Sequence, residues 1–141
     1  LIKSHCAIPY CIDFSEKMIS KVKAQGIDGE VADIENFKLD KKFDKALCAG
    51  ALEFTKDPVK VAYCLRKHLK ENGYIVILYP RFNFFGMLYK IFHLLHGINI
   101  KLFTINDIKN ICAYNNLHIG KITEVHLFGG VVKLVSNELL F

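Results

Sequence analysis

The sequence predicts an α/β sandwich whose mostly parallel sheet ends in an antiparallel hairpin. Short apolar segments alternate with amphipathic helical segments through the first half of the chain, and such alternation builds parallel sheets. Residues 74–79 form an unbroken apolar run, which is typical of a strand covered on both faces. Two further strand-like segments, 118–128 and 131–136, are joined through Gly129-Gly130, a hairpin signal.

The first strand and helix of the chain are predicted from an apolar run followed by a capping residue. Residues 8–13 read as a strand that ends in the carboxylate of Asp13. Ser15 is a good N-cap, Phe14 can form a hydrophobic staple with Ile19, and Gly26 ends the helix. The expected buried stripe of this helix comprises Met18, Ile19 and Val22. A second short strand, residues 29–33, again ends in an acid, Asp33.

A strand–helix–strand crossover occupies the centre of the chain. Residues 43–49 read as a buried strand and residues 50–56 as a connecting loop. Asp57 and Pro58 suit the first turn of a helix, because aspartate accepts bonds from unpaired N–H groups and proline needs no donor there. We expect Asn72-Gly73 to stop this helix before the apolar strand at 74–79.

An aromatic-rich insert, residues 81–103, follows the central crossover. Its middle part, about residues 84–96, is predicted to be a helix with apolar residues nearly all round, so it must be buried against the body or cover a ligand. The last helix begins after Thr104, which forms a capping-box pair with Asp107. Its inward positions are Ile105, Ile108, Ile111 and Cys112.

Composition favours one globular domain over residues 1–141 and argues against nucleic-acid binding. Hydrophobic residues make up 52% of the chain, enough for a sizeable core. The net charge of +5 comes from 19 lysines and arginines scattered along the chain, whereas a nucleic-acid surface gathers basic residues on one face. Five cysteines form no CxxC pair and no zinc spacing, so we expect no metal and a reducing, cytoplasmic location. The apolar segment 82–95 is too short to cross a membrane.

Four segments in order resemble the later part of a class I S-adenosylmethionine-dependent methyltransferase domain. They are Cys11–Met18, Val31–Ile34, Phe43–Pro58 and Leu65–Tyr74. They resemble, in turn, the family's second strand and helix, its third-strand acidic turn, its fourth strand and loop, and the turn before its fifth strand. The last helix and the two strands at 118–128 and 131–136 resemble the C-terminal elements of the family's domain. The resemblance implies a Rossmann-like methyltransferase sandwich and an enzyme that uses S-adenosylmethionine.

The family's first strand and glycine-rich turn are missing from this sequence. In the family, that strand lies between the strands that here end at Asp13 and Cys48. Neighbouring strands lie about 4.8 Å apart, so its loss would leave a gap of roughly 10 Å in the sheet. We therefore expect the sequence to be the N-terminally incomplete part of a longer chain.

The resemblance implies a set of cofactor-binding residues. Asp13, at the carboxyl end of a strand, would accept both ribose hydroxyls; the alternative is an acid that stabilises a helix N-terminus. Phe14 would pack on the adenine face, or serve only as the staple. Asp33 would accept the adenine amine and the Ile34 backbone would add a contact; the alternative is an ordinary turn aspartate. Finally, Cys48, Ala49 and Gly50 would lie beside the methionine part of the cofactor. The Cys48 thiol would fill space there rather than react.

Catalysis of methyl transfer is expected to come mainly from positioning and from exclusion of water, because transfer from a sulfonium is an in-line displacement. A general base helps only when the acceptor must lose a proton. His93 and Glu53 are the candidates for such a base. A packing or surface histidine and a solvated glutamate are the corresponding alternatives.

The aromatic side chains suggest a small, hydrophobic, lipid-like or quinone-like methyl acceptor. The residues expected to line its pocket are Phe54, Tyr79, Phe82, Phe85 and Tyr89. Alternatively, these rings only fill the core. Partial burial at a membrane surface, with Lys90 and Lys101 flanking the apolar face, is a less favoured alternative.

Two other functional classes remain open from the sequence. A nicotinamide-dependent oxidoreductase also has an acid at the end of its second strand, although the Asp33 turn and the terminal hairpin argue against it. A non-catalytic methyltransferase-like protein that binds a partner is the second. Nothing in the sequence indicates an oligomeric state.

Overall fold

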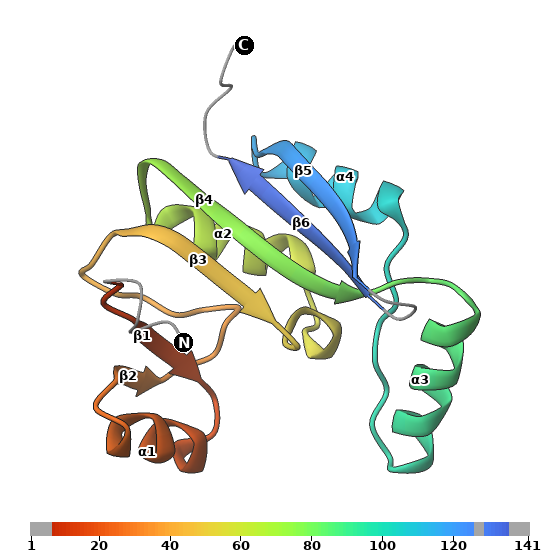
Figure 1. Ribbon diagram of the computed structural model, residues 1–141, viewed down its shortest axis with the longest axis horizontal. Coiled ribbons are helices and arrows are strands. Elements are labelled where there is room, and N and C mark those ends of the chain that lie inside the picture. Colours follow the sequence, from red (N-terminus) through yellow and green to blue (C-terminus); the bar gives the residue numbers. More distant parts are fainter. Residues whose placement is uncertain (1–6, 126–128, 136–141) are drawn as a thin grey trace. The chain divides into compact units, whose positions relative to one another are not determined.

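The computed structural model describes residues 7–125 and 129–135 of the chain, which fall into two compact units (Figure 1). Unit 1 comprises residues 1–38 and unit 2 comprises residues 39–141. The described strands lie in two sheets, β1-β2 in unit 1 and β3-β4-β6-β5 in unit 2.

Unit 1 contains a parallel strand pair and one helix. Strand β1 (Tyr10–Asp13) pairs in parallel with β2 (Asp28–Val31), and α1 (Glu16–Ala24) connects them. The Ser15 side chain accepts a hydrogen bond from the N–H of Met18, so the predicted N-cap is confirmed. At the carboxyl end of the pair, Asp13 lies opposite Val31.

The predicted staple and part of the predicted buried stripe of α1 are wrong. Phe14 is 83% exposed, so it does not pack on the helix as a staple would. Ile19 is buried, Val22 is half-buried and Met18 is exposed. Two short strands offer the helix only a narrow apolar surface, which accounts for the single buried position.

Unit 2 is built on a four-stranded mixed sheet. Strand β3 (Phe43–Ala49) runs parallel to β4 (Leu69–Pro80), while β6 (Gly129–Val135) is antiparallel to both β4 and β5 (His118–Val125). The terminal antiparallel hairpin is thus confirmed. Figure 1 shows α2 (Pro58–Lys67) and α4 (Ile105–Tyr114) on the same face of this sheet, and α3 (Phe84–Leu95) beyond the carboxyl end of β4. Fully buried side chains of this core include Val61, Ile75, Ile77, Ile108, Val132 and Leu134.

The start of α2 was predicted correctly and its end was not. The Asp57 carboxylate accepts the N–H groups of Val59 and Lys60, as expected for an N-cap. The helix ends at Lys67 rather than at Asn72-Gly73. His68 explains the earlier end, because its Nδ1 bonds to the Cys64 carbonyl, one of the last carbonyls of the helix.

The residues Lys70–Gly73 form an irregularity inside β4 instead of a helix terminus. The pairing of β3 with β4 jumps from Phe43 opposite Leu69 to Lys45 opposite Tyr74. Lys70 forms an ion pair with Asp44, with 2.9 Å between Nζ and Oδ2. The Asn72-Gly73 signal therefore marks a break in strand pairing, which sequence alone cannot distinguish from a helix stop.

The glycine pair before the last strand has a different role from the predicted turn. Gly129 and Gly130 lie in β6, and the residues 126–128 that precede them are outside the described part of the chain. A Cβ on Gly130 would lie 2.7 Å from the Tyr79 ring. Gly130 is therefore required because the Tyr79 ring crosses the backbone at this point.

The aromatic helix is confirmed but is not buried as expected. In α3 only Gly86 is buried, and the helix begins with the Asn83 side chain accepting the Gly86 N–H at 2.8 Å. The exposed apolar side chains of α3 are Phe84, Met87, Leu88, Ile91, Phe92, Leu94 and Leu95. Burial against the described part of the body is thus wrong for this helix, and the alternative that it covers a ligand stays a prediction.

The capping of α4 is confirmed in full. The Thr104 hydroxyl accepts the Asp107 N–H, and the Asp107 carboxylate accepts the Thr104 N–H at 2.7 Å. Ile108, Ile111 and Cys112 are buried as expected, whereas Ile105 in the first turn is exposed. The capping box thus fixes where the helix begins, while its first turn extends beyond the core.

Asn115 links the two helices that cover the sheet of unit 2. It is buried, and its Nδ2 donates to the Val59 carbonyl at 3.0 Å and to the Ile111 carbonyl at 2.9 Å. Its removal would take away the side-chain donor that joins the part-buried Val59 carbonyl of α2 to α4, together with the buried bond to the Ile111 carbonyl.

We expect Asn115→Ala to lower the free energy of unfolding by about 1–3 kcal/mol, because a buried hydrogen-bond partner is lost. Asn110→Ala, the same change at an exposed position of α4, should alter it by less than about 0.5 kcal/mol. Urea denaturation followed by far-ultraviolet circular dichroism measures both. Equal destabilisation by the two variants would contradict the role given to Asn115.

Candidate functional site

The carboxyl ends of β1 and β2 form one rim of unit 1. The two strands are parallel, and the Ala32 N–H donates to the Asp13 carbonyl at 3.0 Å, which extends the pairing beyond Val31. Asp33 follows Ala32 directly. The two acids that end these strands are therefore brought to the same rim, as the sequence predicted.

The two acids of this rim differ in how much of each carboxylate is already bonded. Asp13 Oδ1 accepts the Ser15 N–H at 2.8 Å, while Oδ2 has no hydrogen-bond partner among the described residues. Asp33 is exposed, and its carboxylate accepts the Glu35 N–H at 2.9 Å and the Asn36 Nδ2–H at 3.3 Å. Asp33 thus stabilises its own turn, although each oxygen retains a second lone pair.

The remaining predicted cofactor residues of unit 1 lie next to these acids. Phe14 exposes 83% of its surface, so its ring is available to stack on a planar ligand. Ile34 is half-buried within the turn that Asp33 stabilises. The Asp13 carboxylate has one oxygen without a hydrogen-bond donor among the described residues, and it lies next to the exposed Phe14 ring. This combination suits a nucleoside, which offers hydroxyl donors and a flat base.

The carboxyl end of β3 contains the three predicted residues of unit 2. Cys48 is 2% exposed, and burial, with a smaller contribution from Glu53, raises the pKa of its thiol to about 11. Ala49 and Gly50 are exposed. Gly50 has φ +65°, and a Cβ at this position would meet nothing within 4 Å, so the backbone here is open to an approaching group.

Glu53 is a buried acid just after β3. It lies in a short 3₁₀ helix, η2 (Leu52–Phe54), and is 4% exposed, so the alternative of a solvated glutamate is wrong. Its Oε2 has no hydrogen-bond partner among the described residues. Burial raises the pKa of the carboxyl, an effect that its own backbone N–H and His93 partly oppose.

His93 and Tyr89 face Glu53 from α3. The Tyr89 and His93 rings are one helical turn apart, with centroids at 4.5 Å and an interplanar angle of 80°. Phe54 of η2 meets the His93 ring edge-on at 5.8 Å. Burial and, less strongly, Glu53 raise the pKa of the Tyr89 hydroxyl. Both predicted catalytic candidates therefore belong to one cluster in unit 2.

The aromatic residues predicted to contact the acceptor occupy different environments. Phe54 and Phe82 are exposed, and Phe85 and Tyr89 are half-buried. Tyr79 is 4% exposed and packs edge-on against Phe103, with 6.2 Å between the ring centroids. Tyr79 thus contributes to the core, and contact of all five side chains with an acceptor stays a prediction.

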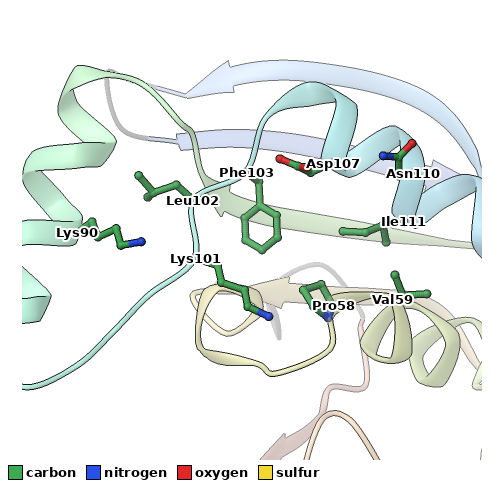
Figure 2. Close-up of a pocket in the computed structure, with 9 residues that line it drawn as sticks. All are labelled: Pro58, Val59, Lys90, Lys101, Leu102, Phe103, Asp107, Asn110 and Ile111. Carbon is green, nitrogen blue, oxygen red and sulfur yellow. The ribbon is translucent and has the colours of Figure 1, made fainter.

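A pocket of about 430 Å³ lies between the first turn of α2, the first two turns of α4, Lys90 of α3 and the segment 101–103 (Figure 2). Sequence reasoning missed it, and it contains none of the five predicted aromatic residues. Its polar groups are largely committed elsewhere, because Asp107 completes the capping box and the Lys101 ammonium donates to the Lys56 carbonyl. Its lining residues are Pro58, Val59, Lys90, Lys101, Leu102, Phe103, Asp107, Asn110 and Ile111.

The described residues contain neither a metal-binding cluster nor a helix that could span a membrane. No group of three or more histidine, cysteine, aspartate or glutamate side chains there is arranged to hold a metal ion. Over the same residues, no helix combines the length and the apolar character needed to span a bilayer.

Residues 1–77, more than half of the chain, match the family model described as a methyltransferase domain. No curated protein is detectably similar to the chain in sequence. Among solved structures, a Thermotoga maritima protein described as an S-adenosylmethionine-dependent methyltransferase, possible histamine N-methyltransferase, is similar with a TM-score of 0.81 at 17% identity. The match covers 91% of this chain and 72% of that one.

Two other similar structures come from bacteria. Magnesium protoporphyrin IX methyltransferase from Synechocystis, solved with S-adenosylhomocysteine, has a TM-score of 0.72 at 18% identity, with 93% of this chain and 65% of that one covered. An S-adenosylmethionine-dependent methyltransferase from Mesorhizobium loti has a TM-score of 0.72 at 18% identity, with 89% and 79% covered. The chain thus spans between about two thirds and four fifths of these proteins, and the predicted fold class is confirmed.

Cys48 is expected to be unreactive at neutral pH because its thiol has a pKa of about 11. At pH 8 the folded chain should be alkylated by iodoacetamide at Cys48 roughly a hundredfold more slowly than the urea-unfolded chain, since only the thiolate reacts. Mass spectrometry of the labelled peptides measures both rates. Comparable rates would indicate an accessible, ionised thiol and contradict the space-filling role of Cys48.

Proposed function

This chain belongs to the S-adenosylmethionine-dependent methyltransferase domain family, and we propose that it methylates a small, hydrophobic acceptor by in-line displacement. The observation that carries this proposal is the parallel register of β1 and β2, which brings Asp13 and Asp33 to one rim. Ligands of open parallel sheets bind beyond the carboxyl ends of the strands.

The cofactor in this proposal is held by its nucleoside at unit 1. Asp13 uses the free lone pairs of its carboxylate to accept the two ribose hydroxyls, and the exposed Phe14 ring packs on the adenine. Asp33 accepts the adenine amine with lone pairs that its own turn leaves available, and the Ile34 backbone adds a contact. S-adenosylmethionine supplies an activated methyl group on a sulfonium.

The end of β3 contributes backbone groups to the methionine part of the cofactor. Ala49 and Gly50 are exposed, and the open space above Gly50 permits close approach. Cys48 fills space beneath them as a neutral thiol. These residues orient the reacting groups and exclude water, which supplies much of the catalysis in an in-line displacement.

The exposed aromatic side chains around α3 support a hydrophobic acceptor. Phe54 and Phe82 are exposed and Tyr89 is half-buried, so they offer apolar surface to a small molecule. The similar proteins named above include one that acts on a porphyrin. Docking of α3 at a membrane surface is the less favoured use of the same side chains.

Two alternatives are distinguished by binding. For a nicotinamide-dependent oxidoreductase, calorimetry would detect heat with NADH and none with S-adenosylmethionine. For a non-catalytic binding protein, S-adenosylmethionine would bind, yet no component of a cell extract would receive a labelled methyl group. A cytoplasmic location is part of the proposal and is supported by the four cysteines that the structure describes, all of which are free thiols.

We expect Asp13→Ala to weaken S-adenosylmethionine binding at least about tenfold, because hydrogen bonds to a charged group are lost. Asp28→Ala is the matched control, since Asp28 lies at the opposite, amino end of β2. This variant should bind the cofactor with unchanged affinity. Calorimetric titration measures both affinities, and an unchanged far-ultraviolet spectrum shows that folding is intact. Unchanged affinity in Asp13→Ala would remove Asp13 from the site.

A further inference from the structure

Glu53 is a buried acid whose hydrogen bonding is incomplete. Its side chain is 4% exposed and Oε2 has no partner within the described ranges, while its backbone carbonyl accepts the Lys101 N–H at 2.9 Å. A buried acceptor without a donor costs about 1–3 kcal/mol, and more when it is charged. Such a group in a folded protein calls for an explanation, and a catalytic or binding role is one of the established ones.

The groups that face Glu53 from the described part of the chain provide no fixed positive charge. They are the Cys48 thiol from β3 and the Tyr89 and His93 rings from α3. The Lys101 ammonium donates to the Lys56 carbonyl and is thereby committed elsewhere. Among the described neighbours, only His93 can acquire a positive charge, so a bound cation would supply the fixed charge that an ionised Glu53 lacks there.

The immediate surroundings of the carboxyl are aromatic. Tyr89 and Phe54 both pack edge-on against His93, with centroid distances of 4.5 and 5.8 Å. Aromatic faces attract organic cations, and a carboxylate attracts the same cations by charge and hydrogen bonding. A carboxylate next to aromatic rings therefore suits an ammonium group that carries an apolar substituent.

We propose that Glu53 binds the amino group of the methyl acceptor, which is therefore a hydrophobic amine. This inference rests on the proposed methyl transfer and names its substrate class. Glu53 lies three residues after Gly50, on the loop that follows the carboxyl end of β3. The acceptor nitrogen is thus directed to the strand end that the proposal above gives to the methionine part of the cofactor.

Glu53 also receives the proton that the amine must lose before it can accept a methyl group. The ammonium N–H bond breaks, its electron pair remains on nitrogen as the attacking lone pair, and the proton bonds to Glu53 Oε2. Burial assists this step, because it increases the proton affinity of the carboxyl. His93, half-buried beside Glu53, then passes the proton to solvent.

The test measures binding of matched amines and alcohols to the full chain by calorimetry. The pairs are 2-phenylethylamine with 2-phenylethanol, tyramine with its alcohol, and tryptamine with its alcohol. At least one amine should bind the unmodified chain more tightly than its alcohol. Glu53→Gln should weaken the binding of that amine roughly tenfold to a hundredfold and change the affinity for the alcohol by less than about twofold.

Glu71→Gln, the same change on the exposed irregularity of β4, serves as the control and should affect neither probe. The inference is overturned if no amine is preferred to its alcohol, or if Glu53→Gln leaves amine binding unchanged or weakens both probes equally. S-adenosylhomocysteine is titrated into the same samples. Its failure to bind the unmodified chain would overturn the proposed methyl transfer, whereas normal binding without amine preference would overturn only this inference.

A second measurement keeps Glu53 in place, in case Glu53→Gln does not fold. Amine binding should weaken as the pH falls through the pKa of the Glu53 carboxyl, because the protonated acid no longer attracts an ammonium. Because the His93 ring lies beside Glu53, the titration is repeated in His93→Gln, where the dependence should persist. Loss of the dependence in His93→Gln would assign it to the histidine and contradict the role of Glu53.

Discussion

The parallel pairing of β1 with β2 is the constraint on which the proposed site depends. The hydrogen bond from the Ala32 N–H to the Asp13 carbonyl continues this pairing past the last paired residues. Because the strands run in the same direction, the acid after each one reaches the same rim. An antiparallel pair would put these acids at opposite ends, so the binding role proposed for both acids depends on strand direction.

Much of the fold could be predicted because the decisive interactions are local. The helix caps at Ser15, Asp57 and Thr104 depend on a side chain bonding to an N–H two or three residues away, and all three are present. The features that were mispredicted depend on distant contacts. His68, at the end of α2, accepts the Leu39 N–H with its Nε2 at 3.0 Å, and Gly130 is required by the ring of Tyr79, more than forty residues earlier in the chain.

The candidate site likewise contains residues that local sequence indicates and residues whose surroundings depend on distant parts of the chain. Asp13 and Asp33 could be proposed from the sequence because each comes at the end of a recognisable strand. The register of those strands brings both acids to the same rim. Glu53 was only a weak candidate, since nothing in the residues around it indicates burial. Its environment is created by Tyr89 and His93, about forty residues later, and the incomplete hydrogen bonding of Oε2 becomes visible only when these elements are assembled. The pocket beside Lys90 likewise combines distant segments.

The central claim, that the rim of unit 1 holds a nucleoside, is tested most directly by nuclear magnetic resonance of the ¹⁵N-labelled chain during titration with S-adenosylhomocysteine. The amide signals of residues that follow the strand ends, Phe14, Ser15 and Ile34, should shift most. Those at the amino ends of the same strands, Tyr10 and Asp28, should change little. Saturable shifts confined to other parts of the chain, with these rim signals unmoved, would contradict the account.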